Sequence, residues 1–293
     1  MAEAAPGRPA SRTAVLVAQA RAVADGRIAP DRFADPVAVR LLDDTERADV
    51  ERARDDSPPP GWRQRMAYEL LRATAEQMAV RTVTVDDAIR AAATPQVVIL
   101  GAGLDDRAWR LEELAGVTVV EVDHPASQAD KRRRVEGLEP VSAPRYAAVD
   151  LATSPLGPAL ATVGFDETLP TTWVWEGVVM YLAPPAVEST VGQVAALSAP
   201  GSRLIVNYAS PSWVTLLGRL VFVRLARLTG GETPFADEPN RSAWKPEGMG
   251  RLLTRHGFRV DTDDDLAATA QSVGVEIQHR ARLRPFRIVV ARR

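Results

Sequence analysis

Short apolar runs recur along the chain from residue 96 onward, and each is long enough for one buried strand. They occupy residues 96–100, 117–122, 145–149, 172–176, 203–208 and 286–291. The clearest helix between them lies within 184–202, which opens with two prolines and ends at Pro200-Gly201. Its apolar stripe consists of Val187, Val191, Val194 and Leu197. Continuous apolar runs that alternate with helices predict an α/β fold with a parallel sheet buried on both faces.

The first part of the sequence has a helical rhythm instead. Residues 1–13 are polar, contain two prolines and are expected to be disordered, whereas 14–53 favour helices broken around 25–36. Consecutive prolines make 54–62 a loop. A helix is predicted from Trp62 to Arg81, and a second from Thr84, whose side chain would cap it. Residues 14–293 would then form a single domain in which 14–93 are a helical N-terminal cap.

Residues 210–243 interrupt the alternation of strands and helices. The segment is too long for a plain connection, so we expect an inserted helical lid or an element on the substrate side. Its stretch 213–228 is the most membrane-like part of the chain. That stretch is shorter than the roughly 20 residues that span a bilayer and carries three arginines.

Composition removes several classes of function. The 293 residues carry a formal net charge of −2 and contain no cysteine and only three histidines, none in an HExxH pattern. Thiolate nucleophiles, Cys-ligated zinc and that type of metal site are therefore excluded, and no basic stripe suggests a nucleic-acid partner. The first residues lack a continuous apolar segment typical of a signal peptide. We expect a cytoplasmic protein without a membrane partner or a metal.

The stretch QVVILGAGLDDRAWRL, residues 96–111, carries the main chemical signal. Gly101 and Gly103 end the first strand with a tight turn that a ligand could approach closely, although a bare strand-to-helix turn has the same pattern. Twenty residues later the second strand ends at Asp123. A carboxylate at this spacing favours binding to the hydroxyls of an adenosine ribose over helix capping alone.

The residues around the turn indicate which adenosine cofactor is involved. The dinucleotide fingerprint GxGxxG has Asp106 in its third position here, and a negative side chain would repel a pyrophosphate at the helix N-terminus. No Tyr is followed four residues later by Lys, so that acid–base pair of short-chain dehydrogenases is missing. S-Adenosylmethionine, which has a ribose and a sulfonium but no phosphate, fits better.

Longer motifs make the comparison specific. The segments RTVTVDDAIRAA, QVVILGAGLDDRAWRL, VTVVEVDHPASQADKRRRV, YAAVDL, WVWEGVVMYL and PGSRLIVNY occur in this order. Together they resemble the leucine carboxyl methyltransferase family, and in particular its bacterial branch of S-adenosylmethionine-dependent O-methyltransferases. The resemblance runs from about Arg21 to the C-terminus and includes Phe33, Asp35 and Pro36. It implies a class I methyltransferase fold, Rossmann-like, with a seven-stranded, mostly parallel sheet. Residues 256–262 and 284–293 would form its C-terminal antiparallel hairpin.

The resemblance also implies cofactor-binding residues. Arg81 would bind the methionine carboxylate, Gly101 the amino-acid tail, Asp123 the ribose, Asp150 and Leu151 the adenine, and Glu176 the ammonium group. Gly103, in the same turn, is also expected to bind the cofactor. The residues themselves support Arg81, because it shares a helical face with Met78, Val85 and Ile89 and a buried charge needs a partner. An arginine extending from a helix end is the alternative. For Asp150 and Glu176 the alternatives are helix caps or solvated loop acids.

Two positions depart from the family pattern. Asp106 stands where bacterial relatives usually carry Thr, so it would weaken cofactor binding or face solvent. Asn207 stands where Asp is frequent, and no role is assigned to it.

The chemistry expected is transfer of a methyl group to oxygen. A carboxylate acceptor is already ionised at neutral pH, whereas a phenol needs a base. His124, His256 and Tyr181 are the candidates; structural roles are favoured for all three, and only Tyr181 is retained, as an acceptor-side residue. Residues 213–228 would suit an apolar or aromatic small molecule, or else form a core or dimer-contact helix in a monomer or homodimer. A non-catalytic cofactor-binding protein and a nicotinamide-dependent oxidoreductase remain alternative functions.

Overall fold

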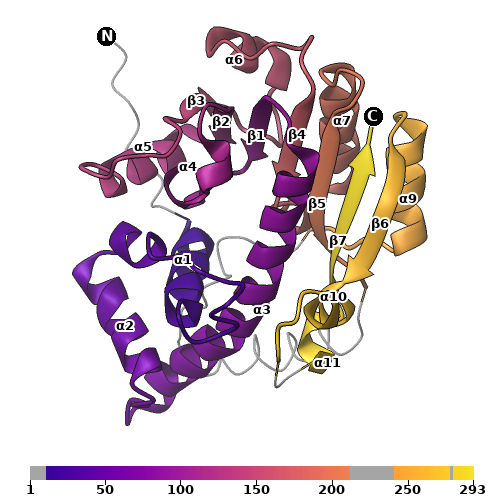
Figure 1. The fold of residues 1–293 in the computed structure, drawn as a ribbon. Coiled ribbons are helices and arrows are strands. Elements are labelled where there is room, and N and C mark those ends of the chain that lie inside the picture. The colour runs from indigo at the N-terminus through magenta and orange to yellow at the C-terminus, as the bar shows by residue number, and fades with distance from the viewer. Residues whose placement is uncertain (1–10, 212–240, 278–279) are drawn as a thin grey trace.

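The protein folds around one twisted sheet with helices on both faces (Figure 1). The computed structural model describes residues 11–211, 241–277 and 280–293. Its strands are β1 (Gln96–Leu100), β2 (Thr118–Asp123), β3 (Arg145–Ala148), β4 (Thr171–Trp175), β5 (Arg203–Ala209), β6 (Arg259–Asp265) and β7 (Phe286–Arg292). Its α-helices are α1 (Arg12–Ala24), α2 (Asp44–Arg54), α3 (Trp62–Ala92), α4 (Arg107–Arg110), α5 (Pro125–Arg134), α6 (Leu156–Thr162), α7 (Pro184–Ala196), α9 (Pro246–Arg255), α10 (Leu266–Ser272) and α11 (Arg280–Leu283). Short 3₁₀ turns are η1 (Ala38–Leu41), η2 (Glu112–Leu114) and η3 (Val179–Tyr181).

The strand order is β3-β2-β1-β4-β5-β7-β6. Strands β1 to β5 are parallel, and β7 runs antiparallel to both β5 and β6. The six apolar runs predicted as strands coincide with β1 to β5 and β7 to within one residue at each end. The α/β class, the seven strands and the antiparallel C-terminal pair are therefore confirmed.

Burial on both faces explains why these strands are continuously apolar. Val97 and Ile99 pack into a core that includes residues of α1, α3 and α10. Val98 and Leu100 face the opposite way, into a second core that includes residues of α7 and α9. Successive side chains of a strand point to opposite faces, so neither set is left in water.

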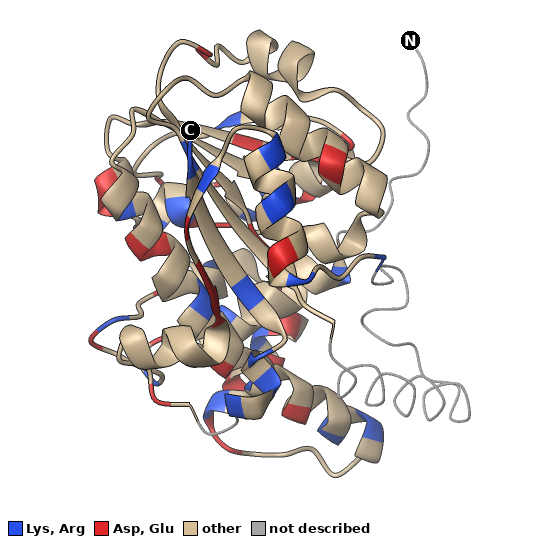
Figure 2. Ribbon diagram, turned by 90° about the vertical axis from the view of Figure 1, so that its right-hand side faces the viewer, with Lys and Arg blue, Asp and Glu red and all other residues tan. Residues whose placement is uncertain are grey.

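Strand β6 lies three residues beyond the predicted position 256–262, at Arg259–Asp265. It is an edge strand that carries four aspartates, and the acidic strand is visible in Figure 2. Its side chains therefore give no apolar alternation that could fix its limits. Backbone pairing with β7 sets them, with an irregularity between Val260 and Thr262. Charges on an edge strand also discourage pairing with another sheet.

Two helical predictions are wrong in their limits. Helix α3 is continuous from Trp62 to Ala92, and the Thr84 hydroxyl donates to the Val80 carbonyl at 2.7 Å instead of capping a second helix. The buried face of this half of α3 includes Met78, Val85 and Ile89, and its burial compensates for the β-branched residues. Helix α1 begins at Arg12, with Ser11 as its N-cap, inside the segment expected to be disordered. The lid predicted at 210–243 lies almost wholly outside the described residues.

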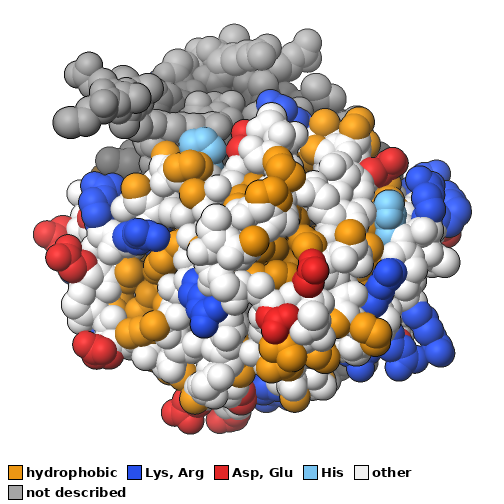
Figure 3. Space-filling view, turned by 90° about the horizontal axis from the view of Figure 1, so that it is seen from above, with side chains coloured by type: hydrophobic (Ala, Val, Ile, Leu, Met, Phe, Trp, Pro, Cys, Tyr) orange, Lys and Arg blue, Asp and Glu red, His pale blue; other side chains and the backbone are white. Residues whose placement is uncertain are grey.

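The surface carries charges of both signs. Figure 3 looks from above the view of Figure 1, and acidic and basic side chains both lie around the rim of this face. That distribution agrees with a net charge of −2. Within the three described ranges, no helix is both long enough and apolar enough to cross a lipid bilayer.

Candidate functional site

The order in which the strands are added reverses between β1 and β4, and a cavity opens at this point. From β1 the chain proceeds outward to β2 and β3, and then returns to place β4 on the other side of β1. Ligands of open α/β sheets bind at such a reversal, beyond the carboxyl ends of the strands. The cavity measures about 530 Å³, within the usual range of small-molecule sites. All the predicted site residues line it, namely Arg81, Gly101, Gly103, Asp123, Asp150, Leu151, Glu176 and Tyr181.

The glycine turn after β1 requires glycine for two reasons. Gly101 has φ +67°, and a Cβ there would lie 2.3 Å from a methyl group of Val178. Gly103 has φ +50°, and its Cβ would lie 3.2 Å from that of Ala14 in α1. Both angles fall in the left-handed region that side chains disfavour. The turn is therefore tightly packed between the loop after β4 and helix α1.

Asp123, the last residue of β2, is held by the same turn. One carboxylate oxygen accepts the Gly103 N–H at 2.5 Å, and the other accepts the His124 N–H at 2.6 Å. Burial raises the pKa of Asp123, and these two backbone donors partly offset that rise. Each oxygen keeps a second lone pair, so the fixed carboxylate can accept further hydrogen bonds.

The chain after β3 contributes Asp150 and Leu151. Asp150 is exposed, and its carboxylate accepts the Ala152 N–H at 2.9 Å. The turn-stabilising role and the position in the cavity wall therefore belong to one residue. Leu151 is half-buried and packs against the core that contains Val98 and Leu100.

Arg81 and Glu176 contact each other. The Arg81 Nε donates to Glu176 Oε1 at 2.5 Å, and the Arg107 Nη2 lies 2.8 Å from Glu176 Oε2. Burial alone would raise the pKa of Glu176, but Arg107 and Arg81 outweigh it and lower the pKa to about 2. Arg81 is buried in the interior of α3, which removes the alternative of an arginine at a helix end. Among the described residues, its terminal Nη atoms have no hydrogen-bond partner.

Asp106 corrects an expectation. It neither faces solvent nor lines the cavity; it is fully buried and pairs with Arg21 at 3.1 Å and with Arg110 at 2.9 Å. Burial raises its pKa, but these arginines prevail and the pKa falls to about 2. Because both guanidiniums neutralise the carboxylate, it cannot be used as an argument against a pyrophosphate. Asp105, its neighbour, is the acid that lines the cavity.

Arg107 organises the acids beneath the cavity and was not predicted. It is 2% exposed and pairs with Asp86 at 2.6 Å, with Asp105 and with Glu176. These acids come from α3, the glycine turn and the end of β4. The acidic pair followed by Arg in the sequence was the available signal, but only the fold shows which partners it joins.

Helix α1 forms a wall of the cavity that the sequence did not reveal. Arg21 donates to the Leu104 carbonyl in the glycine turn at 2.7 Å and pairs with the buried Asp35 at 2.9 Å. Thr13 also lines the cavity, and its buried hydroxyl oxygen has no hydrogen-bond partner in the described part of the chain. An unpartnered polar atom in the wall is suited to a polar ligand.

The two histidines considered for base catalysis occupy helix ends. His124 is the N-cap of α5, where its Nδ1 accepts the Ala126 N–H at 3.2 Å, and it lies at the cavity wall. His256 is the C-cap of α9 beside Gly192, and it does not line the cavity. Tyr181 lines the cavity from η3.

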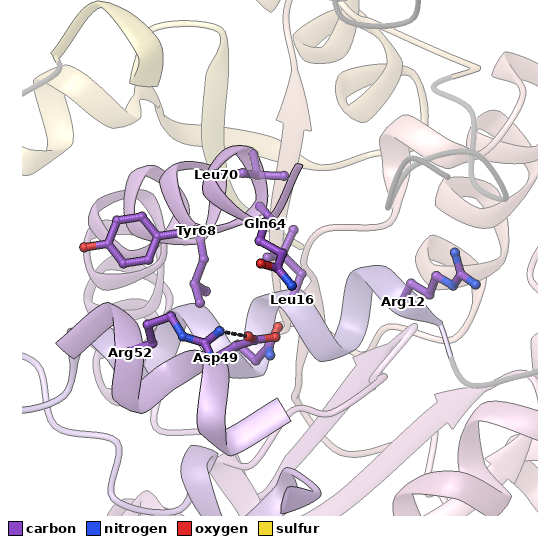
Figure 4. A pocket seen from close by; sticks show the side chains of 10 residues that line it. Arg12, Leu16, Asp49, Arg52, Gln64, Tyr68 and Leu70 are labelled. Carbon is purple, nitrogen blue, oxygen red and sulfur yellow. Dashed lines mark hydrogen bonds and ion pairs between the residues drawn. The ribbon is translucent and has the colours of Figure 1, made fainter. Parts of the chain in front are cut away.

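A second hollow of about 430 Å³ lies between α1, α2 and α3. Figure 4 shows its wall, including Leu16 of α1, Tyr68 of α3 and the Asp49–Arg52 ion pair of α2. Its lining contains neither a glycine turn nor a strand end. We therefore place the functional site at the first cavity, on the other side of α1.

Comparisons with known proteins agree with the fold and the motifs. The family described as leucine carboxyl methyltransferase matches residues 14–195. A Mycolicibacterium gilvum (strain PYR-GCK) protein named "Putative S-adenosyl-L-methionine-dependent methyltransferase" is 35% identical over 285 residues, covering 86% of this chain and 88% of that protein. A Mycobacterium sp. (strain JLS) protein of the same name is 35% identical over 297 residues, covering 92% and 94%.

Solved structures support the fold. A "putative methyltransferase" from Thermobifida fusca YX matches with a TM-score of 0.55 and 19% identity, over 94% of each chain. A DUF574 family protein from Streptomyces avermitilis matches with a TM-score of 0.56 and 14% identity, over 94% of this chain and 96% of that one.

Proposed function

The chain belongs to the leucine carboxyl methyltransferase family and is an S-adenosyl-L-methionine-dependent methyltransferase, and from this premise we propose that it methylates an oxygen atom of a small molecule. The acceptor oxygen would belong to a carboxylate or a phenol on an apolar or aromatic body. One observation carries the proposal: Arg81 and Asp123, from α3 and β2, line the same cavity of about 530 Å³.

The cavity residues fit the cofactor's chemical groups. The fixed Asp123 carboxylate can accept hydrogen bonds from ribose hydroxyls. The Nη atoms of Arg81, which have no hydrogen bond to any described residue, can bind a carboxylate in a bidentate manner. Val178 lies so close to Gly101 that no side chain fits there, so the turn offers backbone atoms to the cofactor. Asp150 and Leu151 would lie beside the adenine, and Glu176 beside the ammonium group.

The proposed reaction depends mainly on position. S-Adenosyl-L-methionine supplies an electrophilic methyl group carried on a sulfonium. The residues of this chain would hold the acceptor oxygen in line with that carbon and exclude water, which removes much of the entropic barrier. A carboxylate needs no base. For a phenol, the Nε2 of His124 is a candidate proton acceptor in the described wall, and Tyr181 would lie beside the acceptor without serving as a base.

Membership of the family weighs against a nicotinamide-dependent reaction. Asp106 does not, because Arg21 and Arg110 neutralise its charge. A protein that binds the cofactor without catalysing transfer would have the same cofactor pocket as an enzyme. Only an assay of transfer separates that case from an enzyme.

The test is transfer of label from methyl-labelled S-adenosyl-L-methionine to a panel of carboxylic acids and phenols. We expect labelled product from at least one acceptor class, identified by mass spectrometry, and loss of transfer in Arg81→Met. Mild base hydrolyses a methyl ester but not the methyl ether of a phenol, so this treatment would distinguish the two products. Binding of the cofactor without transfer to any acceptor would contradict the proposal.

A further inference from the structure

Arg241 lines the cavity, and hydrogen bonds of its backbone hold it in this position. Its N–H donates to the Met180 carbonyl at 2.7 Å, and that of Ser242 donates to the same oxygen at 3.2 Å. The Ser242 hydroxyl donates to the Val179 carbonyl at 2.9 Å. These bonds attach the segment to η3, the turn that carries Tyr181.

The side chain of Arg241 differs from the other arginines of the cavity wall. Arg21 and Arg81 are buried and paired with carboxylates. Arg241 is exposed, lines the same cavity, and its guanidinium has no ion pair with any described residue. Arginine carries five N–H donors in a fixed fork, so an exposed Arg241 in the cavity wall, without an ion pair to the described residues, is suited to binding an incoming carboxylate.

Its position is at the end of the cavity away from the ribose-binding residue. The strand order places Asp150 and Asp123 beyond β3 and β2, whereas Val178 and Tyr181 follow β4, on the other side of β1. Arg241 is held against this second group. Val178 and Leu182 provide apolar surface beside it. This end therefore adds the charge of Arg241 and apolar walls to the Arg81–Glu176 ion pair, which lines the same cavity.

We propose that Arg241 is a specificity-determining residue that binds the carboxylate of the acceptor, so that the enzyme selects carboxylic acids over neutral phenols. The inference rests on the proposed function and narrows it. In the reaction, a lone pair of the carboxylate oxygen forms the new C–O bond, and the electrons of the S–CH₃ bond stay on sulfur. The carboxylate and sulfonium charges both disappear, and no proton moves.

This charge balance predicts how Arg241 acts. The acid is an anion that pairs with the guanidinium, whereas the methyl ester is neutral and loses that pairing, which favours product release. Negative charge leaves the carboxylate as the bond forms, so the ion pair is no stronger in the transition state than in the bound acid. An interaction of this kind lowers KM without raising kcat.

The experiment compares three variants of the full chain: Arg241→Gln, Arg241→Lys and a control, Arg251→Gln. Arg251 is an exposed arginine of α9 that does not line the cavity. Benzoic, cinnamic and decanoic acids and their primary amides are titrated onto protein saturated with S-adenosyl-L-homocysteine, with phenol as a neutral comparison. Turnover of any acid that is a substrate gives KM and kcat.

The acids are expected to bind wild type better than their amides, and Arg241→Gln is expected to weaken the acids at least about tenfold while leaving the amides unchanged. Arg241→Lys should retain part of the acid affinity, and Arg251→Gln all of it. For a substrate acid, KM should rise with kcat little changed. Equal loss for acids and amides, or no preference of wild type for any acid, overturns the inference.

Cofactor binding separates this inference from its premise. Arg241→Gln should bind S-adenosyl-L-methionine like wild type, and weakened binding would overturn the role assigned to Arg241. Failure of wild type itself to bind the cofactor would instead remove the proposed function, and this inference with it. Methyl transfer confined to neutral phenols would leave the methyltransferase standing and overturn the role of Arg241 alone.

Discussion

Arg81 and Glu176 form an ion pair at the base of the cavity, with Nε and Oε1 2.5 Å apart, although the two residues are 95 positions apart in the sequence. The two residues expected to bind opposite charges of one amino-acid tail therefore also hold each other. Arg107 fixes the second oxygen of Glu176. A site whose charged groups are oriented by their neighbours loses less entropy when a ligand binds.

Acid should reveal this arrangement in the stability of the protein. Glu176 in the unfolded chain takes up a proton near its ordinary pKa of 4.5, whereas in the folded protein it stays ionised down to about 2. Its contribution is therefore complete above pH 4.5 and is lost as the pH falls toward 2. Between pH 7 and pH 3 the loss from this group amounts to about 2 kcal/mol.

Urea unfolding of wild type and Glu176→Gln at pH 7 and pH 3 measures that contribution. The free energy of unfolding should fall more in wild type, by about 2 kcal/mol, because glutamine does not titrate. Asp106, whose pKa is also about 2, should keep contributing to the acid sensitivity of both proteins. An identical fall in both proteins would contradict the pairing of Glu176.

Replacing Arg107 should be far more damaging than replacing a surface arginine. Arg107→Met leaves Asp86, Asp105 and Glu176 buried without their shared partner. Removing one partner of a buried ion pair costs about 3–5 kcal/mol. Arg90, which pairs with Asp87 and Glu113 on the surface, serves as the control, and Arg90→Met should cost at most about 1 kcal/mol. Similar losses in urea unfolding would argue against a structural role for Arg107.

Gly101→Ala should abolish cofactor binding for a steric reason. The new methyl group would lie 2.3 Å from Val178 and would force the cavity wall to move. Gly137 also has a positive φ, of +77°, but a Cβ there meets nothing within 4 Å. Gly137→Ala therefore reports backbone strain alone, about 1–2 kcal/mol. Binding of S-adenosyl-L-methionine should be lost in the first variant and kept in the second, and equal binding would contradict the close approach at Gly101.

The sequence predicted those parts of the fold that local patterns determine. Strand β1 was placed correctly because four of its five buried residues, 97–100, form one apolar run that ends at Gly101. Strand β6 was misplaced because its register comes from pairing with β7 and not from its own exposed aspartates. The break expected near Thr84 was absent because burial of α3 overrides local helix propensity.

The site was predictable to the extent that its residues sit in motifs. Motifs pointed to the glycine turn, Asp123 and Glu176, which all line the cavity, while the binding roles given to them stay predictions. The burial of Asp106 was not predictable, because it depends on Arg21, which lies 85 residues earlier in the chain. The same holds for α1 as a wall and for Arg241, whose place depends on hydrogen bonds to η3. No periodicity or spacing in the sequence encodes such contacts.

The central claim, that one cofactor binds in this cavity with its ribose at Asp123, is tested most directly by calorimetric titration of S-adenosyl-L-methionine. Wild type and the control Asp166→Ala, an exposed loop acid outside the cavity wall, should give saturable heat with one site. Asp123→Ala should bind at least about tenfold more weakly, because hydrogen bonds to a charged group contribute about 1.5–3 kcal/mol each. Absence of saturable heat in wild type, or unchanged affinity in Asp123→Ala, would contradict the account.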